Sequence, residues 1–375
     1  MPVDNKTKNS QEMPRLFYVD HCAKEGFGTS EQLQEGMLDH DKTDVSEEIL
    51  GRVIRAWHQM KQIPGELPIA YQVRGEWLPI VQKAFSSLVK ALDDGDPVSL
   101  SNILRNFFRI FGDYFGEPTD MLADINRHFR YERFRVFSSR WIDLYGEASL
   151  SEIRNPWIGN PVGFMIDGML FTHVGFIHNH YARRIEDLCS NIDNPAICEI
   201  GGGWGGFAQH LLSRNQNFRY IDYDIPVIAT IAAYYLLNAF PRLRIGLFGE
   251  IDDLAHPLGA HDVVVLPNYA IPYLENESTD ICFNQCSFAE MDELTVREYM
   301  TQFERICRKF ILHENHAWTS GSKNAGYESP GGFEHWDLSQ VEPSSERFKR
   351  IYKITAPFHS DFRAEFFEWL YVRKR

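Results

Sequence analysis

The sequence predicts an α/β protein: a Rossmann-like, doubly wound and mostly parallel seven-stranded sheet with an antiparallel C-terminal hairpin, preceded by a helical N-terminal domain. Two patterns support this prediction. From residue 196 onward, short apolar segments alternate with segments of helical periodicity, which is typical of a parallel sheet. Between residues 46 and 150, apolar residues recur at intervals of three and four, which predicts helices.

The 375 residues leave room for about two domains of roughly 150 residues each. Residues 1–45 are polar and irregular, which predicts a flexible arm, and a segment rich in Gly, Pro and Asn begins after residue 150. The predicted units are a flexible arm (1–45), a helical cap or substrate domain (46–150), a bridging loop and helix (151–195) and a cofactor-binding domain (196–375).

The helices of the N-terminal domain are predicted from EEILGRVIRAWHQM, WLPIVQKAFSSLVKALDD and LSNILRNFFRIFGDYF. A turn at Gly95 and Pro97 precedes the third stretch, and Ser99 or Ser101 is expected to cap its helix. Arg105 and Arg109 lie four residues apart on that helix. They could bind an anionic substrate group, although an ion-paired or solvated face is the favoured interpretation.

The strands of the C-terminal half are predicted where short apolar runs end in polar residues. They are Ala196 to Ile200, Phe218 to Asp222, DVVVLPN (262–268), DICFNQCSF (280–288), FILHEN (310–315), and a terminal hairpin of RIYKITAPF (350–358) and AEFFEWLYVRK (364–374). Helices are expected at 204–213, from Pro226 to Leu237, and over LTVREYMTQFERICR (294–308).

Composition excludes several classes of protein. A net charge of −14 argues against a nucleic-acid partner, for which a basic patch is expected. The chain shows no apolar run of about 20 residues and no apolar N-terminal stretch, which predicts a soluble, cytoplasmic protein without a membrane span. The six cysteines contain no CxxC pair, so we expect free thiols and no structural metal site.

A glycine cluster follows the first predicted strand, in AICEIGGGWGG (196–206). Gly201, Gly203 and Gly206 satisfy the GxGxxG spacing of a dinucleotide site, but the same turn also suits other nucleotide-like cofactors. Glu199 favours S-adenosylmethionine. A carboxylate beside the turn would repel a pyrophosphate, whereas the ammonium and sulfonium groups of S-adenosylmethionine would be attracted to it. The alternative is a strand-end Glu that only caps the next helix.

The ligand of an open parallel sheet lies beyond the carboxyl ends of its strands. Asp224 is expected to accept hydrogen bonds from both ribose hydroxyls, with Asp222 as its competitor. Leu266 and Asn268 end the third predicted strand, where adenine needs an apolar slot and one amide partner, although Asn268 could equally be a turn residue. Asn284 and Ser287 end the fourth and are expected to orient the substrate or the methionine group.

Methyl transfer to a hydroxyl benefits from a general base. Glu290 is the first candidate because it follows the fourth strand end. The other candidates are histidines at the fifth strand end, His313 and His316, and on the bridging helix, His178 and His180. Residues 316–337 form a long loop with several aromatic side chains, which predicts either a lid that stacks on a sugar or a loop anchored in the core.

Several motifs together resemble the bacterial sugar O-methyltransferase family. They are NILRNFFR (102–109), GNP (159–161), EIGGGWGGFA (199–208), YDIP (223–226), FNQCSFAEM (283–291), REYM (297–300) and HEN (313–315). The likeness covers most of residues 50–375. It implies S-adenosylmethionine-dependent transfer of a methyl group to a hydroxyl of a sugar or glycosylated small molecule, in surface polysaccharide or natural-product biosynthesis. It does not identify the catalytic base.

Two other functions stay open at this point. A nicotinamide-dependent oxidoreductase could use the same glycine turn, and a methyltransferase-like subunit without activity could bind a partner. The sequence does not identify the sugar or the hydroxyl, and it leaves homo-oligomerisation open.

Overall fold

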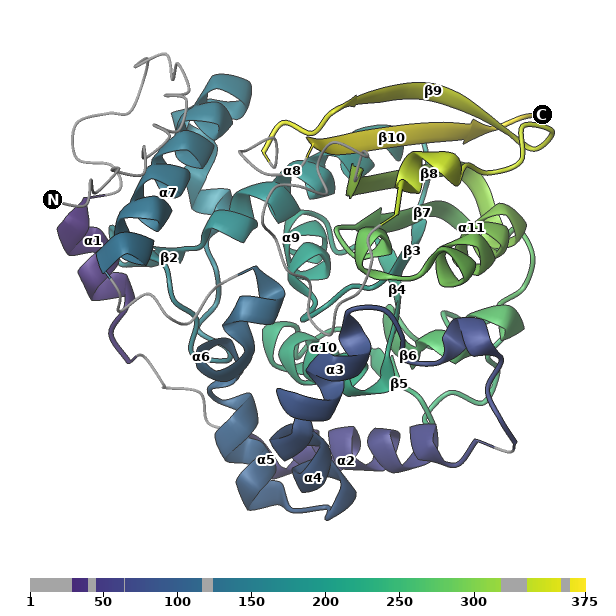
Figure 1. The fold of residues 1–375 in the computed structure, drawn as a ribbon, viewed down its shortest axis with the longest axis horizontal. Coiled ribbons are helices and arrows are strands. Elements are labelled where there is room, and N and C mark those ends of the chain that lie inside the picture. Colours follow the sequence, from purple (N-terminus) through teal and green to yellow (C-terminus); the bar gives the residue numbers. More distant parts are fainter. Residues whose placement is uncertain (1–28, 40–44, 64, 117–123, 318–335, 359–364) are drawn as a thin grey trace, which may run out of the picture.

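The structure is a computed structural model that describes residues 29–39, 45–63, 65–116, 124–317, 336–358 and 365–375. Helices dominate the N-terminal part of the chain (Figure 1). They are α1 (Ser30–Gly36), α2 (Glu47–Lys61), η1 (Ile69–Tyr71), α3 (Trp77–Lys83), α4 (Ser86–Asp93), α5 (Pro97–Leu104), α6 (Phe107–Phe111), η2 (Gly112–Phe115), α7 (Asp124–Tyr145) and η3 (Glu147–Ile153).

Helix starts and breaks differ from the sequence predictions in the N-terminal part. Helix α1 lies inside the segment expected to be a flexible arm. Helix α5 is capped by Asp96, whose carboxylate accepts the amide N–H groups of Val98 at 3.0 Å and Ser99 at 3.2 Å, and not by Ser99 or Ser101. Pro97 therefore occupies the first helical position, where its missing N–H costs nothing.

The central sheet confirms the predicted fold class. Its order is β5-β6-β4-β3-β7-β8-β10-β9, parallel from β5 to β8, with β10 antiparallel to both β8 and β9. The strands are β3 (Ala196–Ile200), β4 (Arg219–Asp224), β5 (Ile245–Leu247), β6 (Val263–Pro267), β7 (Thr279–Gln285), β8 (Cys307–Ala317), β9 (Phe348–Thr355) and β10 (Glu365–Arg373). The described sheet has one more strand than predicted, because β5 is too short to show a periodic pattern.

Helices cover both faces of this sheet, as Figure 1 shows. α8 (His173–Leu188), α9 (Gly206–Arg214) and α10 (Pro226–Ala239) pack on one face, and α11 (Glu293–Ile306) packs on the other. Short elements complete the fold: the β1 (Phe164–Ile166) and β2 (Met169–Phe171) hairpin, η4 (Asn268–Tyr273), η5 (Phe288–Glu290) and η8 (Leu338–Gln340).

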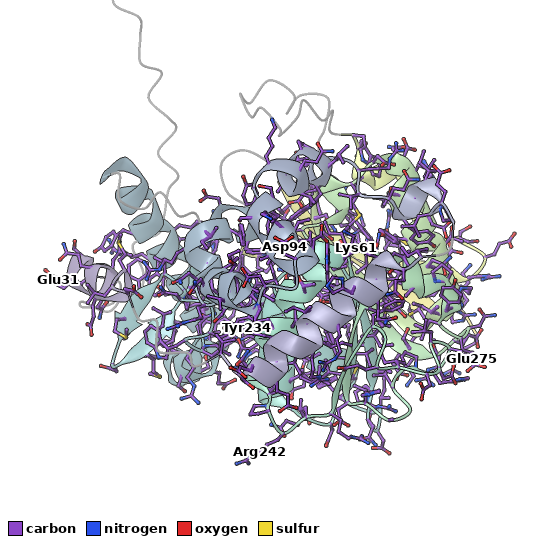
Figure 2. The ribbon with its side chains drawn as sticks, turned by 90° about the horizontal axis from the view of Figure 1, so that it is seen from below. Glu31, Lys61, Asp94, Tyr234, Arg242 and Glu275 are labelled. Carbon is purple, nitrogen blue, oxygen red and sulfur yellow. The ribbon has the colours of Figure 1, made fainter. Side chains whose placement is uncertain are left out.

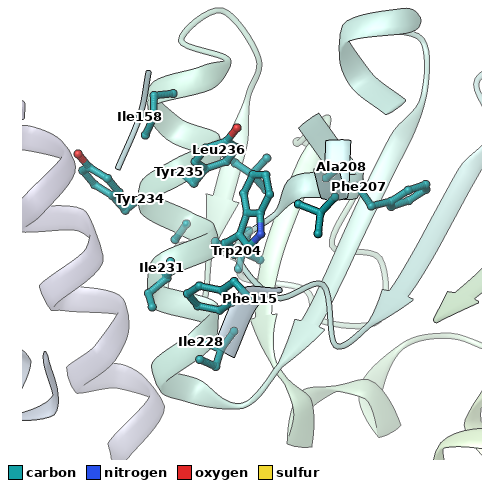
Figure 3. Close-up of a cluster of buried hydrophobic side chains, with 14 of the residues drawn as sticks. Phe115, Ile158, Trp204, Phe207, Ala208, Ile228, Ile231, Tyr234, Tyr235 and Leu236 are labelled. Atoms are coloured by element: carbon teal, nitrogen blue, oxygen red, sulfur yellow. The ribbon is translucent and has the colours of Figure 1, made fainter. Parts of the chain in front are cut away.

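The N-terminal helices share one hydrophobic core with α9 and α10. Trp204, in the glycine turn, contacts Phe108 of α6 with ring centroids 4.9 Å apart and Tyr235 of α10 at 4.7 Å. Figure 3 shows Trp204 beside α10, next to the side chains of Leu236 and Phe115. The helical part is therefore packed directly against the turn that follows β3.

Charged side chains such as Glu31, Arg242 and Glu275 extend from the periphery of the molecule, whereas Tyr234 of α10 is buried inside it (Figure 2). Within the described residues, no helix has both the length and the apolar character needed to cross a bilayer.

Candidate functional site

The glycine turn after β3 adopts backbone conformations that residues other than glycine rarely tolerate. Gly201 and Gly203 have φ values of +75° and +61°, in the left-handed region. A Cβ atom at Gly201 would lie 2.2 Å from Oγ of Ser287, and one at Gly202 would lie 2.5 Å from Oδ1 of Asp222. Nothing lies within 4 Å of a Cβ at Gly203, so the turn exposes its backbone to open space there.

Two carboxylates of β4 hold this turn in place. Asp224 accepts the N–H groups of Gly203 at 2.9 Å and of Ile225 at 2.7 Å. Oδ1 of Asp222 accepts the N–H of Gly202 at 3.2 Å, while its buried Oδ2 has no hydrogen-bond partner among the described residues. Both predicted ribose-binding acids therefore lie beside the glycine turn, and Asp224 is the one that faces the cavity described next.

A narrow cavity of about 60 Å³ opens at the carboxyl ends of the parallel strands. Strand-end residues line one side of it: Gly201, Gly203, Asp224, Asn268 and Ser287. These residues end or follow β3, β4, β6 and β7. The strand order reverses between β3 and β7, which is where ligands of open α/β sheets bind. Helices α10 and α11, with the residues that flank them, contribute Ile225, Ile228, Met291, Asp292, Thr295 and Tyr299.

The opposite wall of the cavity comes from the N-terminal helical part, which was expected to be a cap or substrate domain, but none of the residues that form this wall was among the predicted site residues. Gln72, Arg74 and Trp77 line it. The segment between the predicted helices carries no apolar periodicity, and only its glycine and aromatic residues set it apart from a linker. No pattern in this segment predicts its contact with residues more than 200 positions later in the chain.

Asn268 has a polar atom available to a ligand. Its Nδ2 donates to the backbone oxygen of Tyr71 at 3.0 Å and to the hydroxyl of Tyr299 at 2.9 Å. Its Oδ1 is buried and has no hydrogen-bond partner in the described part of the chain. Leu266 is fully buried in the core on the α11 face and does not line the cavity, so it supports the site only through packing.

Asn284 and Ser287 join the ends of neighbouring strands. Nδ2 of Asn284 donates to the backbone oxygen of Ile200 at 2.7 Å and to Oγ of Ser287 at 2.5 Å, and its Oδ1 accepts from Asn315 at 2.9 Å. The side chain of Asn284 is thus engaged within the protein, while Ser287 lines the cavity.

Acidic groups dominate the electrostatics of this region. Burial raises the pKa of Asp224 to about 7. Burial raises the pKa of Glu199 to about 8, although the hydroxyl of Tyr220 donates to its carboxylate. Glu199 lies beneath the glycine turn and does not line the cavity. A cationic ligand would stabilise the ionised form of these carboxylates.

Glu290, the first candidate for the base, lies beside the cavity on η5. Its Oε2 accepts the indole N–H of Trp77 at 2.8 Å. Burial, together with the negative charge of Glu76, raises its pKa to about 8. A carboxylate with such a pKa can take up a proton near neutral pH.

The candidate histidines lie away from the cavity walls. His180 packs against Phe358, its Nδ1 contacts the hydroxyl of Tyr145 at 2.6 Å, and burial lowers its pKa to about 3. His313 stacks on Trp369, with ring centroids 4.6 Å apart, and burial also lowers its pKa to about 3.

His316 and His178 are packed against aromatic rings. His316, near the end of β8, lies 5.2 Å from the ring of Phe366, and His178 lies 5.4 Å from the ring of Trp204. The structure brings neither of them to the described cavity.

The remaining sequence predictions fall on structural roles or outside the described residues. Arg109 donates to the backbone oxygens of Met37, Leu38 and Asn160, so its guanidinium holds the chain together. Most of the predicted lid, residues 318–335, lies outside the described residues. Five cysteines lie in the described part of the chain and all are free thiols, and no cluster with metal-ligating side chains is found there.

No protein-family profile and no curated protein sequence matches this chain. Among solved structures, it is similar to magnesium protoporphyrin IX methyltransferase from Synechocystis PCC 6803 with bound SAH (11% identity, 54% of this chain and 85% of that one, TM-score 0.37). It is also similar to a glycopeptide N-methyltransferase complexed with sinefungin (10% identity, 53% and 87%, TM-score 0.37). A third is mitomycin 7-O-methyltransferase (11% identity, 54% and 56%, TM-score 0.35). The fold class itself follows from the strand order described above.

Proposed function

We propose that this protein is an S-adenosylmethionine-dependent methyltransferase. The observation that carries the proposal is the cavity at the strand-order reversal, which Asp224 and Asn268 both line, and Oδ1 of Asn268 has no hydrogen-bond partner among the described residues. A carboxylate suits the two hydroxyls of a ribose, and an amide oxygen suits the exocyclic amine of adenine. Together they match an adenosyl group.

The charge of the site favours a cationic ligand over a pyrophosphate. Asp224 and Asp292 line the cavity, and Glu290 lies next to it. Arg74 is the cation among the lining residues of the described cavity, and its Nε contacts Oδ2 of Asp292 at 2.8 Å. A dinucleotide would place its phosphates near the carboxylates of Asp224 and Glu290, whereas a sulfonium and an ammonium would be attracted to them.

When bound, S-adenosylmethionine supplies an electrophilic methyl group. The glycine turn and Asp224 would hold the nucleoside, with Asn268 at the base. Glu290 would take up the proton that the acceptor hydroxyl loses. Its raised pKa suits this role, because a base works best when its pKa lies near the working pH.

The acceptor in this proposal is a hydroxyl of a sugar or a glycosylated small molecule, in surface polysaccharide or natural-product biosynthesis in the cytoplasm. The support comes from the sequence motifs shared with sugar O-methyltransferases, and the free thiols of the described residues suit a reducing compartment.

A labelled-methyl transfer assay tests the proposal. The protein is incubated with methyl-labelled S-adenosylmethionine and extracts that contain glycan precursors, and the labelled product is identified by its mass. Transfer to a sugar oxygen is expected. Transfer to nitrogen or to a molecule without a sugar would contradict the acceptor, and cofactor binding without transfer to any acceptor would favour a non-catalytic binding subunit.

A further inference from the structure

Residues 71–77, which we call the strap, cross the cavity from the helical part of the chain. Residues 72–76 belong to no helix or strand and connect η1 to α3. Gln72 and Arg74 of the strap line the cavity together with Trp77, at the start of α3. The strap therefore supplies the wall of the cavity that comes from the N-terminal helical part.

One end of the strap is anchored firmly. The hydroxyl of Tyr71 donates to Oε1 of Glu298 on α11 at 2.6 Å, and the backbone oxygen of Tyr71 accepts from Asn268 at 3.0 Å. Tyr71 is buried and its ring contacts Tyr299 edge to face, with centroids 6.0 Å apart. This end stays in place unless the packing against α11 is disrupted.

The other end is latched to the η5 turn by polar contacts. Arg74 pairs with Asp292 at 2.8 Å, the N–H of Glu76 donates to the backbone oxygen of Glu290 at 3.2 Å, and the indole of Trp77 donates to Oε2 of Glu290 at 2.8 Å. Between them Gly75, with φ +60°, approaches so closely that a Cβ there would lie 2.4 Å from the backbone oxygen of Glu290.

The latched conformation leaves little room for a ligand. The cavity of about 60 Å³ is far smaller than the roughly 300 to 1,000 Å³ of typical small-molecule sites. The sheet side is built from the glycine turn and the strand ends, which are joined by hydrogen bonds from turn N–H groups to Asp222 and Asp224 and from Asn284 to the backbone oxygen of Ile200. The end of the strap at the η5 turn is held mainly by side-chain contacts, so we expect this wall of the cavity to move when a ligand enters.

We propose that the strap is the gate of the cofactor site: it swings about its Tyr71 anchor, opens when the contacts of Arg74 and Trp77 with the η5 turn break, and closes over the adenosyl group. This inference rests on the proposed function. The N-terminal helical part, which was expected to contact the acceptor, would then also hold and release the cofactor.

The test measures the rates at which S-adenosylhomocysteine enters and leaves the full-length protein. Labelled ligand is bound, and its release is followed after a chase with unlabelled ligand. Association is measured by rapid mixing. The variants are Arg74→Gln and Trp77→Phe, which remove the ion pair and the indole N–H while preserving most of the side-chain volume. The matched control is Arg52→Gln. Arg52 pairs with Glu250 at 2.7 Å, and this ion pair also joins an N-terminal helix to the α/β part of the chain, but it lies away from the cavity.

Both latch variants are expected to speed association and dissociation at least about fivefold, while Arg52→Gln stays within about twofold of the unaltered protein. Amide hydrogen exchange in residues 72–77 should slow when the ligand binds. Unchanged rates in both latch variants would overturn the gate while leaving the proposed function intact, and so would equal acceleration in Arg52→Gln. No binding to the unaltered protein would overturn the proposed function and the gate with it.

Discussion

The indole N–H of Trp77 donates to the carboxylate of Glu290 across 2.8 Å, although the two residues lie 213 positions apart in the chain. This contact joins the first residue of α3 to the turn that follows β7. It fixes the orientation of a carboxylate whose pKa is raised to about 8, and it closes one side of the cavity.

Glu290→Gln is expected to lower turnover by about a hundredfold or more, because the amide cannot take up the acceptor proton. Affinity for S-adenosylhomocysteine should change little, since the amide oxygen of Gln can still accept the N–H of Trp77. Steady-state kinetics and calorimetric titration measure the two quantities. Glu293→Gln, at an exposed carboxylate paired with Arg297, is the control. If turnover survives in Glu290→Gln, the base is another group.

The stability of the ligand-free protein should fall as the pH rises from about 6.5, above which the buried histidines are neutral in both the folded and the unfolded state, to about 8. Burial raises the pKa of Glu199 and Glu290 to about 8 and that of Asp224 to about 7, from ordinary values near 4. In this window the unfolded chain has already released these protons while the folded protein still holds part of them, so the free energy of unfolding decreases with pH.

Melting temperatures measured across this pH range check that expectation. We expect a decrease of several degrees without ligand and a smaller decrease with S-adenosylmethionine, because its positive charges stabilise the ionised carboxylates. A melting temperature that rises between about pH 6.5 and about pH 8 would contradict the assignment of raised pKa values.

Asp224→Asn should weaken binding of S-adenosylhomocysteine by about 1 to 3 kcal/mol, because charge-assisted hydrogen bonds to the ribose are lost. Calorimetric titration measures the change, and Asp252→Asn, at an exposed position, is the control. Unchanged affinity would assign the ribose to Asp222, whose Oδ2 has no partner among the described residues.

Recognition of adenine through Oδ1 of Asn268 predicts discrimination against an inosine analogue. The unaltered protein should bind S-adenosylhomocysteine about tenfold more tightly than S-inosylhomocysteine, which carries an oxygen in place of the exocyclic amine and so loses about one hydrogen bond. In Asn268→Leu this preference should disappear. Equal discrimination by the variant and the unaltered protein would place the adenine elsewhere.

Local patterns in the sequence predicted the parts of the site that lie on the sheet. The apolar run before Gly201 and the Asp-Ile-Pro at 224–226 correctly indicated strand ends, and parallel strands bring their carboxyl ends to one edge. Asn268 was expected at the cavity for the same reason, and it lines the cavity. Leu266 was also expected there, but its side chain packs into the core on the face of β6 that α11 covers.

Contacts between distant segments could not be predicted in this way. Trp77 and Arg74 are close to Glu290 and Asp292 only because α2 packs on α10 and the chain then returns across the carboxyl edge of the sheet. His180 shows that a correctly predicted helix does not fix the direction in which its side chains point. Its position on the bridging helix is as predicted, but the helix turns it toward Tyr145 and Phe358.

The most direct test of the proposed cofactor is thermal unfolding with saturating S-adenosylmethionine or S-adenosylhomocysteine, compared with NAD. A ligand present at a hundred times its dissociation constant stabilises the folded state by about 2.7 kcal/mol, which raises the melting temperature measurably. We predict an upward shift with both adenosyl compounds and none with NAD. A shift with NAD and none with S-adenosylhomocysteine would contradict the account.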